Sequence, residues 1–452
     1  MKKRLNSNTI KTSRFLIKKL TFSEINQNYL SWFLDKETKK FIENIPKNVL
    51  ELKKYIKETL KKKNVLFYSI YFKNQHIGNV KFEKVNLRNS STYLGILIGE
   101  RTWRNKGVGY EVLKKMINYL YLKYGIFKFY LGVNKNNLAA INLYRKLGFK
   151  EINENRKKKT LKMFHNFINS KIVIGSAQFG SDYGINNRKG ELSFNEIKRI
   201  KNYAQKNSID SFETAQSYGS AEKKLGKLNL TRFKIITKLQ RLNKIYSKKA
   251  IDNHIKNSLK KLKVKKIYGL LVHDVNDLTG LNGSKVFKLL EKYKKRQIVK
   301  NLGVVVYNLK ELKKVTKKFK FDIISVPCSI FDRRFIESEV VKKLKSSNVK
   351  IYARSIFLQG LLLLNVNRIP ANFLKWKNEF LRFNNLSNRK KISKVEICTK
   401  FVLENYLIDK IIIGCDSFNQ FKNIVDINYN KKLNLKIKFK TNNEKLINPS
   451  LW

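Results

Sequence analysis

The chain has 452 residues, which is too long for one ordinary domain and predicts two or three. Because 42% of its residues are hydrophobic and 12% aromatic, it can bury sizeable cores, and an intrinsically disordered protein is excluded. The 97 Lys and Arg residues outnumber the 33 Asp and Glu residues, giving a formal charge of +64. The lysines occur in every segment, which favours a solvated surface and phosphate-bearing ligands over a dedicated nucleic-acid site.

The cysteines and the N-terminal segment indicate no metal site, disulfide framework or signal peptide. Cys328, Cys398 and Cys415 are far apart and form no CxxC pair, so the sequence predicts neither a metal site nor a disulfide framework. Residues 1–20 are basic but lack the apolar core of a signal peptide, and no uncharged apolar run approaches the length of a membrane span. We therefore expect a soluble, cytoplasmic protein, and its oligomeric state stays open.

Residues 1–168 predict an α+β domain. Consecutive antiparallel strands are expected at 67–72, 76–85 and 92–100, with a further strand at 127–133. One helix is predicted in GVGYEVLKKMINYLYLKYG (107–125) and another in NLAAINLYRKLGF (137–149), and a glycine fits the end of each.

The segment RNKGVG (104–109) joins the third strand to the first of these helices. Its glycines let the backbone turn its amides toward one point, and the helix N-terminus adds partial positive charge. Arg104 and Lys106 add full charges. The pattern suits a pyrophosphate, although an ordinary basic turn has the same composition.

Residues 13–165 resemble the GNAT acetyltransferase superfamily, which places Arg/Gln-x-x-Gly-x-Gly/Ala at this junction and Asn-x-x-Ala-x-x-Leu-Tyr-x-x-x-Gly-Phe in the later helix. The resemblance implies acetyl-CoA as cofactor, and Tyr144 as the acid that protonates the departing thiolate. The cofactor-binding residues that it implies are Leu97, Ile98, Arg104, Asn105, Lys106, Gly107, Val108, Gly109 and Asn137. The general base stays open between Glu100, Glu83 and water, and the acceptor between an amino-sugar nucleotide and a protein N-terminus.

A charged stretch at 151–170 precedes a region, 169–452, in which β-rich runs alternate with helical patterns. The eight runs lie at 171–175, 209–213, 233–238, 267–273, 302–306, 321–327, 349–355 and 410–415. Helices are predicted at 193–207, which opens with a Ser193–Glu196 capping box, and at 250–262, 284–295, 337–347, 394–406 and 419–427. An open doubly wound sheet would alternate in the same way, but the number of strands favours a (β/α)8 TIM barrel.

The loops that follow the strands build the active site of such a barrel. Glu213, Lys238 and His273 are expected at the ends of the second, third and fourth strands, and Tyr218 in the loop after the second. The barrel therefore predicts that these four groups converge on one mouth.

This region resembles the aldo/keto reductases, through GSAQFGSDYG (175–184), FETAQSYGSAE (212–222), IITK (235–238), LLVHD (270–274) and IIIGCDSFNQFKN (411–423). The resemblance implies NADPH as hydride donor and Tyr218 as proton donor. Lys238 and His273 would lower the pKa of the tyrosine and orient the substrate, and Glu213 would pair with the lysine. The remaining cofactor contacts that it implies are Ser325, Ser417, Gln420 and Asn423.

Several positions depart from the pattern of that family. The tetrad acid is Glu213 in place of Asp, and Val305 replaces the serine that holds the nicotinamide carboxamide. Ser325 and Ser329 replace a glutamine and an asparagine. Two hypotheses follow: a bifunctional acetyltransferase and reductase of nucleotide-linked amino or keto sugars in surface-glycan biosynthesis, or an acetyltransferase whose barrel is a binding or scaffold module.

Overall fold

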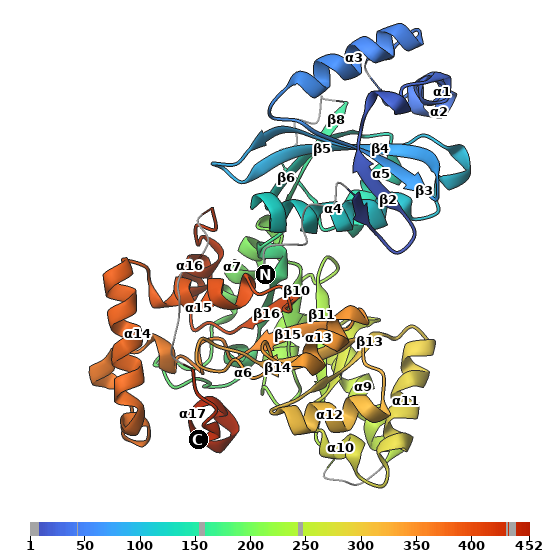
Figure 1. Ribbon diagram of the computed structural model, residues 1–452. Coiled ribbons are helices and arrows are strands. Elements are labelled where there is room, and N and C mark those ends of the chain that lie inside the picture. Colours follow the sequence, from blue (N-terminus) through green and yellow to red (C-terminus); the bar gives the residue numbers. More distant parts are fainter. Residues whose placement is uncertain (1–8, 43, 153–158, 243–246, 431–432, 434–439) are drawn as a thin grey trace. The chain divides into compact units, whose positions relative to one another are not determined.

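The computed structural model describes residues 9–42, 44–152, 159–242, 247–430, 433 and 440–452. The chain divides into two compact units, Met1–Ser170 and Lys171–Trp452, each with its own sheet and helices (Figure 1). None of the described helices is both long and apolar enough to cross a membrane.

The first unit is built on an eight-stranded sheet with the order β1-β2-β3-β4-β5-β6-β8-β7. Its strands are β1 (Thr9–Lys11), β2 (Leu16–Lys19), β3 (Leu66–Phe72), β4 (Gln75–Asn86), β5 (Ser91–Ile98), β6 (Lys128–Asn134), β7 (Lys150–Glu151) and β8 (Thr160–Asn166). Its helices are α1 (Gln27–Leu34), α2 (Lys36–Lys39), α3 (Val49–Lys61), α4 (Val108–Tyr124) and α5 (Leu138–Lys146). The predicted α+β architecture is confirmed.

Helix α4 packs one face onto this sheet. Val112, Met116 and Leu120, spaced by one helical turn, are fully buried in the larger core of the unit. The helix begins after Gly107 and ends at Gly125, and both glycines have positive φ, 77° and 70°. A second core, between the sheet and α1 and α3, includes Leu52 and Ile56.

Strands β5 and β6 separate along their length. They are parallel, and their pairing is limited to Ser91–Tyr93 of β5 with Lys128–Tyr130 of β6. The rest of β5 pairs with β4 alone. Because the strands separate, the backbone of residues 94–98 forms no strand pairing on the side that faces β6. An extended ligand with amide groups can bind there.

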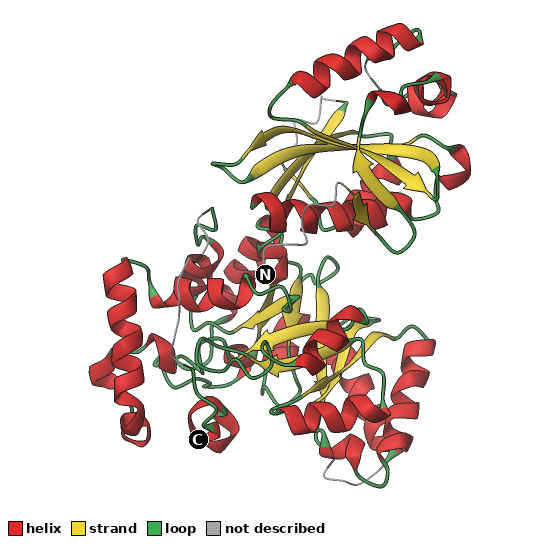
Figure 2. Cartoon of the chain, in the orientation of Figure 1, coloured by secondary structure: helices red, strands yellow, loops and turns green. Residues whose placement is uncertain are grey.

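The second unit is a closed barrel of parallel strands, which confirms the (β/α)8 prediction and excludes the open sheet. The strands are β9 (Ile172–Gly175), β10 (Ser211–Glu213), β11 (Lys234–Leu239), β12 (Ile267–Val272), β13 (Val299–Val305), β14 (Ile323–Pro327), β15 (Lys350–Arg354) and β16 (Lys410–Ile413). Strand β9 closes the ring by pairing with both β16 and β10. Figure 2 shows helices around these strands.

The helices of the barrel include all those predicted and several that were not. They are α6 (Ala177–Gly180), α7 (Phe194–Lys206), α8 (Ala221–Gly226), α9 (Lys248–Leu262), α10 (Asn276–Thr279), α11 (Gly283–Lys295), α12 (Leu309–Lys318), α13 (Glu339–Ser346), α14 (Lys377–Lys390), α15 (Lys394–Leu403), α16 (Phe418–Val425) and α17 (Glu444–Ile447). Helix α14 and the short 3-10 turns before it fill the connection between β15 and α15.

The predicted capping box of α7 is only half correct. Ser193 caps the helix, because its side chain accepts a hydrogen bond from the Glu196 amide. The Glu196 carboxylate does not return to Ser193. It accepts instead from the Phe418 amide of α16 at 2.6 Å and from Arg199 at 2.6 Å. A donor far away in the sequence has therefore replaced the local one.

Two glycines hold the turn that carries Tyr218 against helix α6. Gly219 has a φ of +52°, and a Cβ atom built on it would lie 2.0 Å from the carbonyl oxygen of Gly180. A Cβ on Gly180 would lie 2.1 Å from the carbonyl oxygen of Tyr218. Since backbone atoms cannot yield as side chains do, only glycine fits on either side of this contact.

Gly219→Ala should destabilise the barrel more than Gly190→Ala does. Gly190 also has a positive φ, +69°, but a methyl group there meets nothing within 4 Å. We expect Gly190→Ala to cost about 1 kcal/mol of backbone strain, and Gly219→Ala about 1–3 kcal/mol more because of its steric clash. Denaturant unfolding of the full chain measures both, and equal costs would show that the turn does not depend on this contact.

Candidate functional sites

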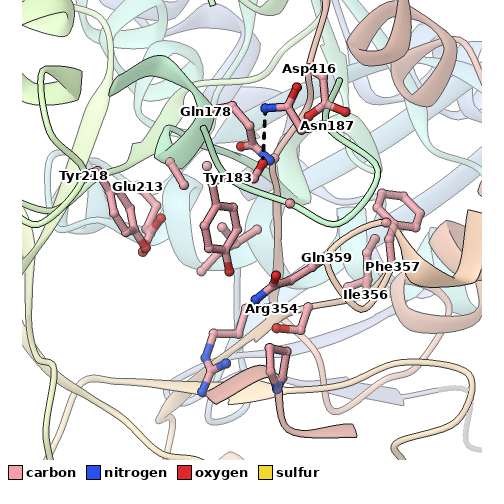
Figure 3. A pocket seen from close by; sticks show the side chains of 18 of the residues that line it. Gln178, Tyr183, Asn187, Glu213, Tyr218, Arg354, Ile356, Phe357, Gln359 and Asp416 are labelled. Carbon is pink, nitrogen blue, oxygen red and sulfur yellow. Dashed lines mark hydrogen bonds between the residues drawn. The ribbon is translucent and has the colours of Figure 1, made fainter. Parts of the chain in front are cut away.

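The four predicted catalytic residues of the barrel line one cavity of about 380 Å³. Glu213 ends β10, Lys238 lies in β11, and His273 directly follows β12. Tyr218 lies in the turn between β10 and α8. Because the strands are parallel, these positions meet at one end of the barrel. Figure 3 shows Tyr218 and Glu213 side by side at the edge of the cavity.

Lys238 connects the other members of the cluster. Its ammonium group forms an ion pair with Glu213 and donates a hydrogen bond to the Tyr218 hydroxyl, which lies 3.5 Å from Glu213 Oε1. Glu213 and Lys238 are only 3% and 5% exposed. Glu213 is one methylene group longer than the aspartate of the family pattern, and it still forms the ion pair with Lys238.

The cluster keeps the phenol protonated at neutral pH. The expectation that Lys238 and His273 lower the pKa of the tyrosine is wrong, because burial raises the pKa of Tyr218 to about 12, with a further increase from Glu213 and only an opposing effect of Lys238. Although burial opposes it, the proximity of Glu213 and Tyr218 raises the pKa of Lys238 above its usual value. A neutral phenol beside an ammonium group can give its proton to an oxygen atom on which negative charge develops.

His273 is neutral under the same conditions. Burial, followed by the positive charges of Lys238, Arg241 and Arg354, lowers its pKa to about 4. A neutral imidazole in the cavity can orient a carbonyl group by a hydrogen bond without adding another charge.

The positions predicted for the nicotinamide carboxamide offer few hydrogen bonds. Val305 lines the cavity with an apolar side chain. Ser329 Oγ is turned toward its own loop, where it accepts from the amides of Phe331 at 3.2 Å and Asp332 at 3.0 Å. Ser325 is fully buried, is not among the residues that line the cavity, and its hydroxyl has no partner in the described part of the chain.

The N-terminus of α16 is occupied by groups of the chain itself. Ser417 Oγ accepts from the Gln420 amide at 3.2 Å, and Gln420 Oε1 accepts from the Asp416 amide at 2.9 Å. Glu196 holds the Phe418 amide. Asn423 is exposed on the same helix. A cofactor phosphate at this helix end would lie near the carboxylates of Glu196 and Asp416.

The cavity also contains polar residues to which the sequence analysis gave no role. Gln178, Tyr183 and Arg354 line it, as Figure 3 shows. Gln178 lies in α6 after β9, and its Oε1 atom is buried without a partner among the described residues. This atom could accept a hydrogen bond from a carboxamide, so the site fits a nicotinamide cofactor despite Val305. The rule that places active-site residues after strands would have indicated Gln178.

In the first unit, the loop RNKGVG forms the expected turn at the start of α4. Asn105 and Gly107 have positive φ, 60° and 77°, and no side chain caps the helix at Gly107. Val108 begins α4, and a Cβ on Gly109 would lie 2.8 Å from Leu143, so this glycine allows α4 to pack against α5. The uncapped amides at the helix start fit a pyrophosphate.

Arg104 is engaged inside the protein. Its guanidinium donates to Asp35 at 2.8 Å, to Thr38 at 3.0 Å and to the carbonyl oxygens of Ile98 and Gly99 at 3.1 and 2.9 Å. It therefore connects the α1–α2 junction to the end of β5, and Asp35 balances its charge. The positive charge expected at the 104–109 loop comes instead from Lys106 and the start of the helix. The Arg14 guanidinium donates a hydrogen bond to the Lys106 carbonyl oxygen at 3.0 Å.

The proposed acid of this unit is a buried phenol. Tyr144 is 6% exposed, and burial raises its pKa to about 12. Its hydroxyl has no hydrogen-bond partner among the described residues, is protonated at neutral pH and can give its proton to a thiolate. Asn137 has a structural role, because its side chain caps α5 at the Ala140 amide, 3.0 Å away.

The two candidate bases are both hydrogen-bonded. Glu100 Oε1 accepts from Asn28 at 3.0 Å and from the Trp32 indole at 3.1 Å, which holds it against α1. Glu83 pairs with Lys81 at 3.0 Å. Glu100 lies two residues after the end of β5, where Leu97 and Ile98 pair with β4 but not with β6, and it is therefore closer in sequence to the expected thioester position.

The partly buried His273 should make the barrel less stable in acid. Its pKa is about 4 in the folded protein against an ordinary value of 6.5, so the unfolded chain takes up the proton first as pH falls. This part of the stability is present above pH 6.5 and is lost as the pH approaches 4. Between pH 7 and pH 5 we expect a loss of about 1–2 kcal/mol that His273→Gln does not show, measured by denaturant unfolding of both proteins. Equal losses would mean that His273 titrates normally.

Comparison with known proteins follows the division into two units. The aldo/keto reductase family matches residues 171–438, and the acetyltransferase (GNAT) domain matches residues 14–150. No curated protein matches the chain.

Several solved structures are similar to one unit or the other. An aldo-keto reductase from Bacillus halodurans is 19% identical, with a TM-score of 0.47 and coverage of 56% of this chain and 85% of that one. A glycerol dehydrogenase from Gluconobacter oxydans is 19% identical, with a TM-score of 0.44 and coverage of 57% and 85%. The ribosomal L7/L12 alpha-N-protein acetyltransferase RimL is 14% identical, with a TM-score of 0.32 and coverage of 34% and 96%.

The reductase match spans more than half of the chain and contains all eight strands of the barrel. Both matched domains are enzyme domains, one an acyltransferase and the other an oxidoreductase. The chain belongs to the aldo/keto reductase family, and its N-terminal unit is a GNAT acetyltransferase domain.

Proposed function

We propose that the protein is a bifunctional enzyme that acetylates an amine with acetyl-CoA and reduces a carbonyl group with NADPH. The observation that carries the reductase part is the buried contact of Lys238 with both Tyr218 and Glu213. Such a cluster holds a protonated phenol at the mouth of a cavity, where a carbonyl oxygen needs a proton.

The residues of the barrel divide the reaction among them. A bound nicotinamide cofactor supplies the hydride that reaches the carbonyl carbon. Tyr218 gives its proton to the carbonyl oxygen, so the product is an alcohol and the phenolate remains beside the Lys238 ammonium group. Glu213 holds that ammonium in place, and His273 orients the carbonyl group from the same cavity.

The residues of the first unit support transfer of an acetyl group. The open side of β5 and the uncapped start of α4 would hold the pantetheine and pyrophosphate of acetyl-CoA. A neutral amine attacks the thioester carbonyl, its C–S bond breaks, and Tyr144 protonates the sulfur. The amine gives up its proton to Glu100, Glu83 or water.

Nucleotide-linked amino and keto sugars are the substrates that we propose, in the biosynthesis of surface glycans. Such a sugar carries the amine and the carbonyl group that the two domains require, and its phosphates suit a chain with a net charge of +64. Acetylation assays with UDP- and CMP-linked amino sugars, beside peptides with free N-termini, test the acceptor. Acetylation of peptides alone would contradict the sugar proposal.

Two tyrosine variants should separate the activities. Tyr218→Phe removes the proton donor of the barrel, so we expect carbonyl reduction to fall at least about 100-fold while acetylation is unchanged. Tyr144→Phe should do the reverse, with a loss of about 10- to 100-fold in acetylation. NADPH oxidation and thiol release measure the two rates on the same preparations.

A second function for the barrel has specific support. The apolar Val305 and the inward-turned Ser329 leave fewer contacts for a carboxamide, which favours a binding or scaffold module without hydride transfer. Titration of NADPH into residues 169–452 and into the full chain decides between the two. If neither the 169–452 fragment nor the full chain binds millimolar NADPH, the barrel is better explained as a binding or scaffold module.

The NADPH proposal also predicts a role for Glu196. Its carboxylate lies at the N-terminal amide of α16, the helix to which the resemblance assigns the adenosine phosphate. We expect Glu196→Gln to tighten NADPH binding about 3- to 10-fold, because a like charge near a phosphate costs about 1 kcal/mol.

NADH, which lacks the additional phosphate, is the internal control for this variant and should bind Glu196→Gln as it binds the original protein. Fluorescence titration measures both affinities. An equal change for NADH and NADPH would show that the phosphate does not reach this helix end.

A further inference from the structure

Arg354 brings a positive charge into the cavity that contains the catalytic cluster. It is the last residue of β15, and it lines the cavity together with Tyr218, Lys238 and His273. Figure 3 shows its side chain reaching into the space that Tyr218 and Glu213 border. A cation here lies at the same barrel end as the proton donor.

The side chain of Arg354 is held in position. Its guanidinium carbon lies 4.3 Å from the centre of the Tyr307 ring, which is a cation–π contact. Nη2 donates a hydrogen bond to the Val306 carbonyl oxygen at 3.1 Å. A planar group fixed on two sides in this way can recognise a ligand with little additional loss of conformational freedom.

The guanidinium of Arg354 has no carboxylate in contact with it in the described part of the chain; Asp332 is near enough for the two charges to influence each other, but it is bonded to Arg334. Arg354 forms no ion pair there, and its Nε atom is buried without a hydrogen-bond partner. Two of the nearby carboxylates serve other cations, whereas Asp416, which lines the cavity before α16, forms no ion pair among the described residues. Glu213 pairs with Lys238, and both oxygens of Asp332 accept from Arg334 at 2.9 Å.

The other cations of the mouth are less suited to bind an anion. Lys238 is neutralised by Glu213 and bonded to Tyr218. Arg241 lies at the rim, with 56% of its side chain exposed and Asp274 3.6 Å away. A partly buried guanidinium without a carboxylate partner is costly unless a ligand supplies the missing anion.

We propose that Arg354 binds an anionic group, a carboxylate or phosphate, carried by the carbonyl substrate, so that the barrel reduces acidic carbonyl compounds in preference to neutral ones. This inference rests on the proposed reductase function and names the substrate class of that site. Arg354 fixes the anionic end of the substrate, and Tyr218 protonates the carbonyl oxygen at the other end.

The test uses the full chain, NADPH and a pair of aldehydes of equal shape, 4-carboxybenzaldehyde and 4-formylbenzamide. The original protein should prefer the carboxylate in kcat/KM. Arg354→Gln should lower kcat/KM for the carboxylate about 10- to 100-fold, the effect of one charge-assisted contact, and change the value for the amide less than about threefold. Arg354→Lys should retain part of the preference.

Arg241→Gln is the matched control, because it removes one positive charge from the same mouth. Its exposed position predicts a change of less than about threefold for either aldehyde. An equal loss on both aldehydes in Arg354→Gln, or weaker NADPH binding with the preference unchanged, would overturn the inference. Absence of any carboxylate preference in the original protein would also overturn it, whether or not the variant folds.

A binding measurement separates this inference from the reductase proposal. If neither aldehyde is reduced, calorimetric titration of benzoate and benzamide into the original protein and Arg354→Gln still tests the site. Benzoate binding that depends on Arg354 would support the anion site although hydride transfer has failed. Benzoate and benzamide affinities that Arg354→Gln leaves equal to those of the original protein would overturn it.

Discussion

The buried ion pair of Lys238 and Glu213 is the interaction on which the barrel site depends. Either charge alone would be expensive to bury, and the two together remain stable because each supplies the other's missing partner. The closed barrel brings the two strands into register, and the Gly180–Gly219 contact sets the turn that places Tyr218 over the pair. The phenol consequently faces a fixed ammonium group, whose charge favours the phenolate that proton transfer leaves behind.

The first unit relies on a comparable buried partner. Arg104 joins Asp35 to the carbonyl oxygens at the end of β5, so its charge stabilises the protein's own loop. This contact holds the strand end at which β5 and β6 have already separated. Backbone amides and a helix start then provide the anion site, which requires few charged side chains. The GNAT resemblance assigns Arg104 to cofactor binding, but in this structure Arg104 contacts the protein itself and shapes the site.

Sequence patterns predicted the strands well because each strand is a short, β-rich run with helical sequence after it. The tetrad followed from motifs at the ends of those strands. The contacts of Arg104, Glu196 and Arg354 could not be predicted in this way, because each depends on a partner from a distant segment. Glu196 shows the reason clearly: its spacing from Ser193 fits a local cap, but the free amide of α16 lies within reach only after folding. Val305 departs from the family pattern in the sequence itself, and the position of Gln178 after β9 could have been noticed there too, but its unpartnered Oε1 atom is visible only in the structure.

The net charge of the chain favours anionic ligands in general, whereas the local distribution of charge in the barrel mouth can discriminate among them. Carboxylates of Glu196 and Asp416 lie at the α16 end, and the guanidinium of Arg354, which forms no ion pair with the residues that the structure describes, lies at the end of β15. A uniformly basic surface would attract any polyanion without regard to its orientation. A mouth with a carboxylate region and a fixed cation instead orients a ligand whose negative group is at one end. Such an asymmetric field selects the direction in which an acidic substrate enters and leaves its carbonyl group facing Tyr218.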